Sequence, residues 1–270
     1  MADAATLLRA RFGADAPAAP DALPDALAAI LDRRVTRRYR ADPVPDALLD
    51  TVLAAAQSAP SKSDLQQYSI IVLRDPARIA SIAGWIGTMD WIKDAPVFLV
   101  FCGDMRRGQA ICAQHGVQHA NNTLETFFNA TVDATLAMAH AMAAADAAGL
   151  GTCPISHIRY HLDKVAPLLG LPDGVHPVAG LTLGWPAQRR AISMRLPPRA
   201  LIHRERYDAA AADDAIAGYD AARAEAEAAS APPGPRRPAT RWSENAARQL
   251  STPEAAGFAA WLRTRGFNLG

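Results

Sequence analysis

The sequence predicts a protein of mixed α/β layers, and three observations support this fold class. Predicted strands alternate with predicted helices along 270 residues, half of them hydrophobic, so the chain is long enough to bury a sizeable core. The run 95–102 is continuously apolar, which is typical of a strand that is buried on both faces. The stretch 123–148 has no proline or glycine and is apolar nearly all the way round, which indicates a long central helix.

The first half of the chain shows clear helix and strand signals. Residues 1–27 are rich in alanine and proline, and we interpret them as an arm with a short helix followed by irregular chain. Periodic structure starts near Asp25, with a helix that runs to Leu31. Apolar residues at i, i+3, i+4 spacing predict a helix over 46–58, which must end before Pro60. The strand and the helix that follow are predicted at 68–73 and 76–86.

The second half contains fewer strong signals. We expect a short helix over 161–166, stopped by Pro167, and a third strand over 178–183. After an alanine-rich helix at 209–229, the proline-rich segment 231–238 predicts a loop.

The chain should end in a helix over 253–265, with Thr252 as its N-cap, Pro253 as its first residue and Gly266 as its stop. We find no internal repeat and assign 28–270 to a single domain.

Charge and composition exclude several classes of partner. The 28 Lys and Arg nearly balance the 27 Asp and Glu, so no basic field exists to attract nucleic acid or anionic lipid. No apolar run has the length of a membrane span. The N-terminus lacks a basic segment followed by an apolar one, which argues against a secretory signal. Three cysteines, far apart, offer no even disulfide set, so we expect a cytoplasmic location.

The common catalytic signatures are missing. The chain holds no G-x-G-x-x-G, no G-x-x-x-x-G-K-[ST] and no G-x-S-x-G motif. His115 and His119 are four residues apart but lack the third ligand that catalytic zinc needs, so we predict no metal. Glu125 and Asp133 share a helix, but a hydrolase needs two facing carboxylates, which a sequence does not show.

Four arginines stand within six residues in the run R-R-V-T-R-R at 33–38. One interpretation is a solvated basic run at the end of a helix. The other is a phosphate cradle, because guanidinium groups match the geometry of a phosphate and Thr36 can donate as well. The run alone leaves these two interpretations evenly matched.

Two further segments have the composition of ligand-binding loops. The run A-P-S-K-S-D-L-Q at 59–66 is small and polar between a helix and a strand, although an ordinary loop would look the same. Arg195 lies in M-R-L-P, after the turn G-W-P at 184–186, where a lone arginine is usually a surface residue.

Together these segments resemble the nitroreductase family of flavoproteins, in particular its branch of oxygen-insensitive NADPH nitroreductases and flavin reductases. The motif R-R-x-x-R with a following aromatic matches 33–39, and A-P-S-x-S-x-x-Q matches 59–66. G-L-G matches 149–151, G-L-x-L-G-W-P matches 180–186, and R-L-P matches 195–197. The resemblance runs from about residue 28 to the end, and the order and spacing of the motifs make it specific.

The resemblance implies FMN as the cofactor and assigns residues to it. Arg33, Arg34 and Arg195 would hold the phosphate and the ribityl chain. Arg37 would lie at the pyrimidine edge of the flavin, where a positive charge stabilises the negative charge that develops on reduction. No protein acid or base needs to be assigned. The other residues implied to bind the flavin are Val35, Ser61, Ser63, Gln66, Met89, Pro154, Ile155, Ser156, His157 and Ser193.

Several positions depart from the pattern of this branch. Val35 stands where the pattern has serine, Met89 where close relatives place a glutamine, and Ser156-His157 where they carry two glycines. The loop that would bind the extra phosphate of NADPH is replaced by the proline-rich segment. Arg236 and Arg237, with Arg241 as a third contact, are the candidates there, so the preference between NADH and NADPH stays open.

The resemblance also implies a fold, an assembly and a reaction. We expect an α+β, three-layer α/β/α sandwich with a mixed central sheet, in an intertwined homodimer whose sites are built from both subunits. NAD(P)H would deliver a hydride to FMN and leave, after which a small oxidant such as a nitroaromatic, a quinone or free flavin takes two electrons. Two alternatives remain: a specialised flavin-dependent dehydrogenase or dehalogenase, with Met89 and His157 in a reshaped pocket, and a flavin-binding protein without turnover.

Overall fold

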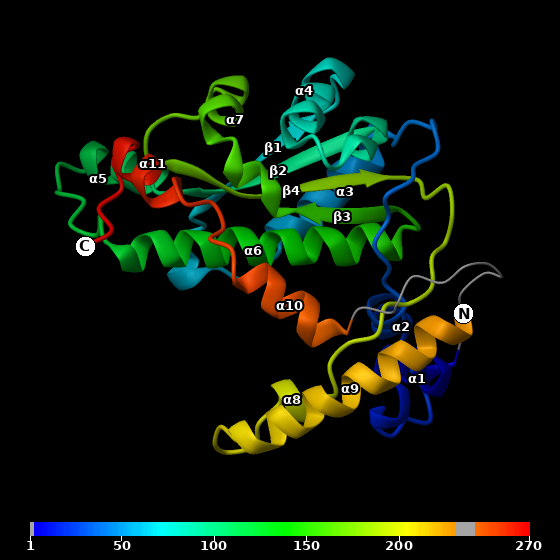
Figure 1. Ribbon diagram of the computed structural model, residues 1–270. Helices are drawn as coiled ribbons and strands as arrows, with labels where there is room; N and C mark the ends of the chain where they lie inside the picture. Colours follow the sequence, from blue (N-terminus) through cyan, green and yellow to red (C-terminus); the bar gives the residue numbers. More distant parts are fainter. Residues whose placement is uncertain (1–2, 231–240) are drawn as a thin grey trace. The chain divides into compact units, whose positions relative to one another are not determined.

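The computed structural model describes residues 3–230 and 241–270, and the chain divides into two compact units (Figure 1). Unit 1 comprises Met1–Arg33 and Ala191–Pro253, and unit 2 comprises Arg34–Arg190 and Glu254–Gly270. The predicted arm 1–27 belongs to unit 1, and the predicted domain 28–270 contributes residues to both units. The predicted loop 231–238 lies outside the described residues.

Unit 2 is built around a four-stranded sheet of strand order β1-β2-β4-β3. The strands are β1 (Tyr68–Leu73), β2 (Val97–Asp104), β3 (Gly151–Ile155) and β4 (Val175–Gly184). Each neighbouring pair is antiparallel. Among the described residues, the one parallel pairing is an isolated bridge of Val35 to Thr152, so the sheet is mixed only through this bridge.

Helices cover both faces of this sheet, which confirms the three predicted layers (Figure 1). One face packs against α3 (Asp46–Gln57) and α6 (Leu124–Ala147), and the other against α4 (Pro76–Ile86) and α7 (Leu162–Leu169). Every residue of β2 is buried, as its apolar run predicts, and so is every residue of β4. Among the described residues, no helix combines the length and hydrophobicity that crossing a bilayer requires.

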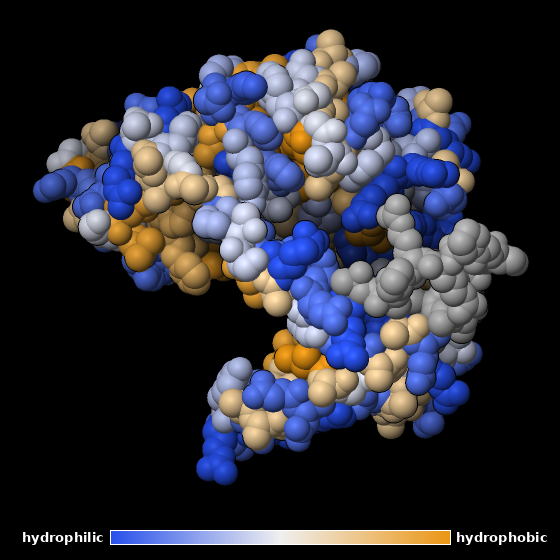
Figure 2. Space-filling model, in the orientation of Figure 1, coloured by the Kyte–Doolittle hydropathy of each residue, from blue (hydrophilic) through white to orange (hydrophobic). Residues whose placement is uncertain are grey.

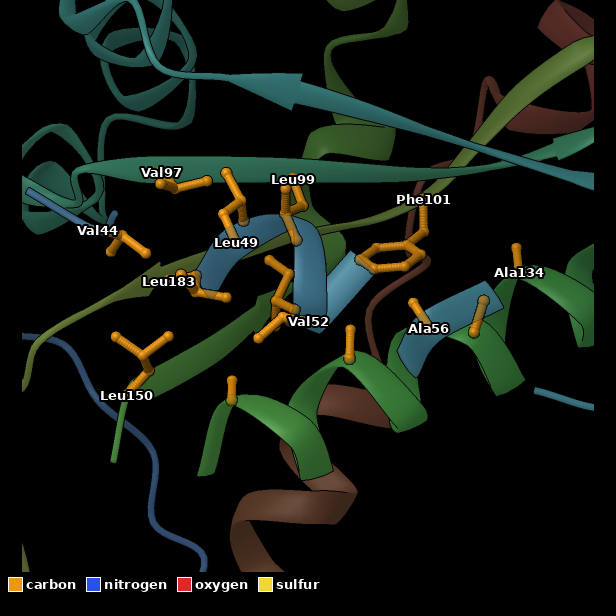
Figure 3. Packing of buried hydrophobic residues seen from close by; sticks show 14 of the residues in the cluster. Val44, Leu49, Val52, Ala56, Val97, Leu99, Phe101, Ala134, Leu150 and Leu183 are labelled. Atoms are coloured by element: carbon orange, nitrogen blue, oxygen red, sulfur yellow. The ribbon is translucent and has the colours of Figure 1, made fainter. Parts of the chain in front are cut away.

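The alternation of side chains along β2 divides the core into two clusters. Val97, Leu99 and Phe101 point toward α3 and α6 (Figure 3), whereas Phe98 and Val100 belong to the cluster on the other face. The α6 residues that meet the sheet are mostly alanines, which let this helix lie close to it. Its buried members are Thr126, Ala130, Asp133, Ala134, Ala137, Ala141 and Ala145.

Several element predictions are confirmed and others are wrong for identifiable reasons. The helices 46–57 and 76–86 and the strand 68–73 lie where the sequence predicts them. Strand β3 was not predicted, because glycine and proline, here Gly151 and Pro154, are uncommon inside strands. The proline is tolerated because β3 is an edge strand. Pro167 does not stop the helix at 166, and α7 continues past it to Leu169.

The C-terminal helix predicted over 253–265 is corrected by the structure. The last helix, α11 (Phe258–Thr264), begins later because Ala255 takes a left-handed φ of 45°, which interrupts helical geometry. An additional helix, α10 (Trp242–Leu250), precedes it.

Unit 1 contains α1 (Ala4–Phe12), α2 (Asp25–Leu31), α8 (Pro198–Leu201), α9 (Ala209–Ser230) and α10. The Asp3 side chain caps α1 by accepting the Thr6 N–H at 2.9 Å. The rings of Tyr219 on α9 and Trp242 on α10 meet edge to face with centroids 5.9 Å apart.

Candidate active site

In unit 2, the arginine-rich segment is fastened to the edge of strand β3. The Thr36 N–H donates to the Thr152 carbonyl at 3.0 Å, next to the parallel bridge formed by Val35. Thr36 is buried against Gly151, where an added Cβ would lie 2.1 Å from the Thr36 Oγ1. Glycine at 151 therefore allows the segment to approach the strand closely.

Two aromatic residues position Arg37. The Tyr39 hydroxyl lies 2.8 Å from the Thr36 carbonyl oxygen and 2.7 Å from the Thr182 Oγ1. Burial raises the pKa of Tyr39, so this hydroxyl stays protonated at neutral pH. The exposed Arg37 guanidinium lies over the Trp91 ring, 5.9 Å from its centroid. The cation is thus held at the surface by a ring that sequence analysis did not single out.

The segment 154–157, where β3 ends, alternates between exposed and more buried residues. Ile155 is 2% exposed and belongs to the core, whereas Pro154 and Ser156 are exposed. The His157 ring stacks on His161, with centroids 6.0 Å apart, and contacts Tyr160. Burial and the charge of His157 lower the pKa of His161. Ser156 and His157 stand where the resemblance expects two glycines.

Met89 and Val35 are half-buried and pack against the same core cluster as Ile155. Met89 is also the N-cap residue of the short helix η3 (Asp90–Asp94), which carries Trp91. The predicted residues Val35, Arg37, Met89 and 154–157 are therefore associated with one side of unit 2, beside strand β3.

The loop predicted to bind the flavin has an unusual backbone. Ser63, Asp64 and Gln66 take positive φ angles of 52°, 56° and 48° around the short helix η2 (Lys62–Asp64). Such conformations cost non-glycine residues free energy and cluster at ligand-binding sites. The Ser61 Oγ accepts the Gln66 N–H at 3.2 Å, while the Gln66 side-chain amide donates to Asp64 at 3.1 Å.

Two charged residues hold this loop in its conformation. The buried Asp133 carboxylate on α6 accepts the N–H groups of Lys62 at 3.0 Å and Gln67 at 2.9 Å, one on each oxygen. Arg107 donates to the carbonyls of Gln66 at 2.5 Å and Tyr68 at 3.1 Å. Asp133, which the sequence offers only as a candidate catalytic carboxylate, therefore supports the loop.

Replacing Asp133 with asparagine should therefore loosen the loop. The amide keeps one acceptor but turns an NH2 group toward a backbone N–H, so we expect a loss of about 1–3 kcal/mol in unfolding free energy. Urea denaturation measures this. Glu125→Gln, an exposed change on the same helix, is the control. Equal stability of Asp133→Asn and the control would show that the two bonds do not hold the loop.

The loop and the arginine segment lie at opposite ends of the sheet within one chain. β1 and β3 are the outer strands, separated by three strand spacings, which amount to about 14 Å. The strand registers place Thr152 level with the C-terminal end of β1, just beyond Leu73, whereas the loop lies at the N-terminal end of β1, before Tyr68. The two segments are therefore also separated by about 25 Å along the strand direction. One chain therefore does not bring the two segments to a single ligand.

In unit 1, Arg33, Ser193 and Arg195 are brought together by a residue that sequence analysis missed. Arg11 donates to the carbonyls of Arg33 at 2.7 Å and Ser193 at 2.9 Å. The Arg195 N–H donates to the Arg11 carbonyl at 2.8 Å, and the Arg195 side chain is exposed.

The candidate ligands of the NADPH phosphate are only partly described. Arg236 and Arg237 lie outside the described residues. Arg241 is exposed at the N-cap position of α10, with its Nε 3.9 Å from the Glu244 carboxylate. No group of metal-binding side chains occurs among the described residues.

Comparison with known proteins places these features in a family. The model of the nitroreductase family matches residues 30–185, and that of its C-terminal domain matches 193–270. An FMN reductase [NAD(P)H] of Bacillus subtilis is 39% identical over 185 residues, 68% of this chain and 74% of that protein. An oxygen-insensitive NADPH nitroreductase of Salmonella typhimurium is 36% identical over 64% of this chain and 71% of that protein.

Solved structures show the same fold. NfrA2 of B. megaterium superposes with a TM-score of 0.86 at 33% identity, covering 92% of this chain and 100% of that one. An NADPH:FMN oxidoreductase from Vibrio harveyi, complexed with NAD+, superposes with a TM-score of 0.80 at 26% identity, covering 90% and 99%.

Proposed function

Because the chain belongs to the nitroreductase family, we propose that it is an FMN-dependent NAD(P)H oxidoreductase that reduces nitroaromatics, quinones or flavins. Relatives named as FMN reductases, as an NADPH nitroreductase and as an NADPH-flavin oxidoreductase support this activity. The observation that carries the proposal is the joint presence of the family match and the arginine-rich residues that the motif assigns to FMN.

The chemistry of these residues fits FMN. A phosphate dianion is matched by guanidinium groups, which Arg33 and Arg195 supply from two segments that Arg11 joins. The strained loop with Ser61, Ser63 and Gln66 offers hydroxyls and main-chain groups to a polar ring. Ile155 is buried, so its contribution would come from the backbone.

When bound, FMN supplies the hydride chemistry, and the protein's part is electrostatic. Arg37 would place its positive charge at the pyrimidine edge, where it stabilises charge that develops during reduction. Trp91 below the guanidinium and the Tyr39–Thr36 contact keep this charge in place. Arg34 would add positive charge near the ribityl chain and phosphate.

We also propose a homodimer whose sites use residues of both subunits. The loop 61–66 and the arginine segment are too far apart in one chain, and a second copy supplies the missing half. The face of α6 turned away from the sheet exposes Leu124 (56%), Phe128 (61%) and Val132 (36%). Figure 2 shows hydrophobic surface at the lower left of unit 2, where α6 begins. Covering this face would bury apolar surface.

The choice between NADPH and NADH as electron donor can be tested by replacing the arginines assigned to the NADPH phosphate. We expect at most a modest preference for NADPH, carried by Arg236 and Arg237 with Arg241 as a third contact, because cationic side chains are needed to read the extra phosphate. Steady-state kinetics with NADPH and NADH should show this preference falling in the Arg236→Ala/Arg237→Ala variant. An unchanged ratio of kcat/KM would mean that other residues read the phosphate.

The visible spectrum of the purified protein tests the main proposal. We expect a flavin absorption that NAD(P)H bleaches rapidly and a quinone restores. A bound flavin that NAD(P)H does not bleach would favour a binding protein without turnover, and a colourless protein that takes up no FMN would contradict the proposal.

The three free cysteines are consistent with a reducing cytoplasm, which we propose as the location.

A further inference from the structure

The N-terminal segment 3–15 lies outside both family matches, which cover 30–185 and 193–270, yet it is folded into unit 1. It forms α1 and a short 3-10 helix, η1 (Gly13–Asp15), and it buries Leu7 and Leu8. Asp15 forms an ion pair with Arg199. Gly13, at a φ of 61°, leaves room for Met194, whose Cε would lie 3.3 Å from an added Cβ. This segment therefore packs beside the chain around residues 194–199.

Within this segment, Arg11 joins the two stretches of chain that carry Arg33 and Arg195. Arg11 is 7% exposed. Its Nη1 donates to the Ser193 carbonyl at 2.9 Å, and its Nη2 donates to the carbonyls of Leu31 at 2.8 Å and Arg33 at 2.7 Å. Its own carbonyl accepts the Arg195 N–H at 2.8 Å.

These contacts suit a residue that positions others. A buried cation is tolerated when its donors are hydrogen-bonded, and here they bond main-chain carbonyls. Because the guanidinium is planar, its donors point in fixed directions and hold the acceptors at fixed separations, which a lysine ammonium on a flexible stem does not do. With these donors committed to the main chain, Arg11 acts on a ligand through the side chains of the segments it joins.

We propose that Arg11 is a positioning residue for the cofactor phosphate. It sets the separation of the Arg33 and Arg195 main chains so that both guanidinium groups meet one phosphate. Because this geometry exists before binding, FMN does not have to order the two segments. The inference rests on the proposed function, in which Arg33 and Arg195 bind the FMN phosphate.

Binding of FMN and of riboflavin, which lacks the phosphate, tests this role. Wild type, Arg11→Met and Arg11→Lys are freed of flavin and titrated with each compound by fluorescence. We expect Arg11→Met to weaken FMN binding by about tenfold or more and to leave riboflavin binding unchanged, because only the phosphate contacts are lost. Arg11→Lys keeps the positive charge but lacks the planar guanidinium group, so its FMN affinity should lie between those of wild type and Arg11→Met. Arg9→Met, at an exposed position on the same helix, should match wild type.

Each outcome has a defined meaning. An unchanged ratio of FMN to riboflavin affinity in Arg11→Met overturns the inference, whether both affinities stay or fall together, because a merely structural role would give that result. If Arg11→Met does not fold, the FMN affinities of Arg11→Lys, Arg195→Ala and the double variant test the role instead. We expect the losses of the two single variants not to add in the double variant, and additive losses would overturn the role. A wild type that binds FMN no better than riboflavin contradicts the phosphate assignment of the proposed function itself.

Discussion

Removing both Arg33 and Arg195 should leave the protein nearly free of FMN at micromolar concentrations. Each single change to alanine removes a charge-assisted hydrogen bond and should weaken FMN binding by about 1.5–3 kcal/mol. If the two losses add, the double variant binds FMN roughly 10²–10⁴-fold more weakly. The effect is large because a phosphate without cationic partners gains little by leaving water.

Fluorescence titration of flavin-free protein measures these affinities, and thermal unfolding without flavin checks that the variants fold. Arg38→Ala is the matched control, since Arg38 lies in the same arginine run with an exposed side chain and no assigned contact to the flavin. Unchanged FMN affinity in both single variants would remove the phosphate assignment, whatever the double variant does.

An aspartate in place of Phe128 should convert the protein to a monomer that no longer binds FMN. Phe128 is 61% exposed on the apolar face of α6, and a carboxylate there would have to be desolvated on dimerisation. The coupling to FMN follows from the sheet geometry, because the loop 61–66 cannot join the arginine segment of its own chain. Light scattering gives the mass, and the visible spectrum reports the flavin.

The matched control for this experiment is Ile111→Asp, an exposed apolar residue on the helix α5 (Arg106–Gln114). It should leave both mass and flavin content unchanged. Wild type that is a stable monomer of about the chain mass at micromolar concentration would contradict the dimer. A monomeric Phe128→Asp variant that keeps its FMN would show that one chain holds a complete site.

Local sequence pattern predicted those elements that show a clear spacing of apolar residues, a continuous apolar run or a proline at the helix start. The helices at 46–57 and 76–86 and the buried strand β2 are of this kind. Strand β3 was missed because Gly151 and Pro154 have low strand propensity, and the strand forms through its pairing with β4. The start of α11 depends on the left-handed conformation of Ala255, which the presence of an alanine does not predict.

The residues that support the site were harder to predict than the residues that would touch the flavin. The arginine run and the loop 59–66 carry recognisable motifs. Asp133 and Arg107 gain their roles from loop carbonyls and N–H groups that come close only in the folded chain. Arg11 lies in an alanine-rich arm, and nothing around it in sequence indicates that it is buried.

The folded N-terminal segment has a practical consequence for biochemists who purify this protein. A recombinant chain trimmed to the start of the family match, near residue 30, would look conservative by homology. It would nevertheless lack Arg11, the three carbonyl contacts of its guanidinium and the Asp15–Arg199 ion pair. Such a preparation would contain little bound flavin and would be only weakly coloured. Its low specific activity would then result from the missing cofactor rather than from a slow reaction.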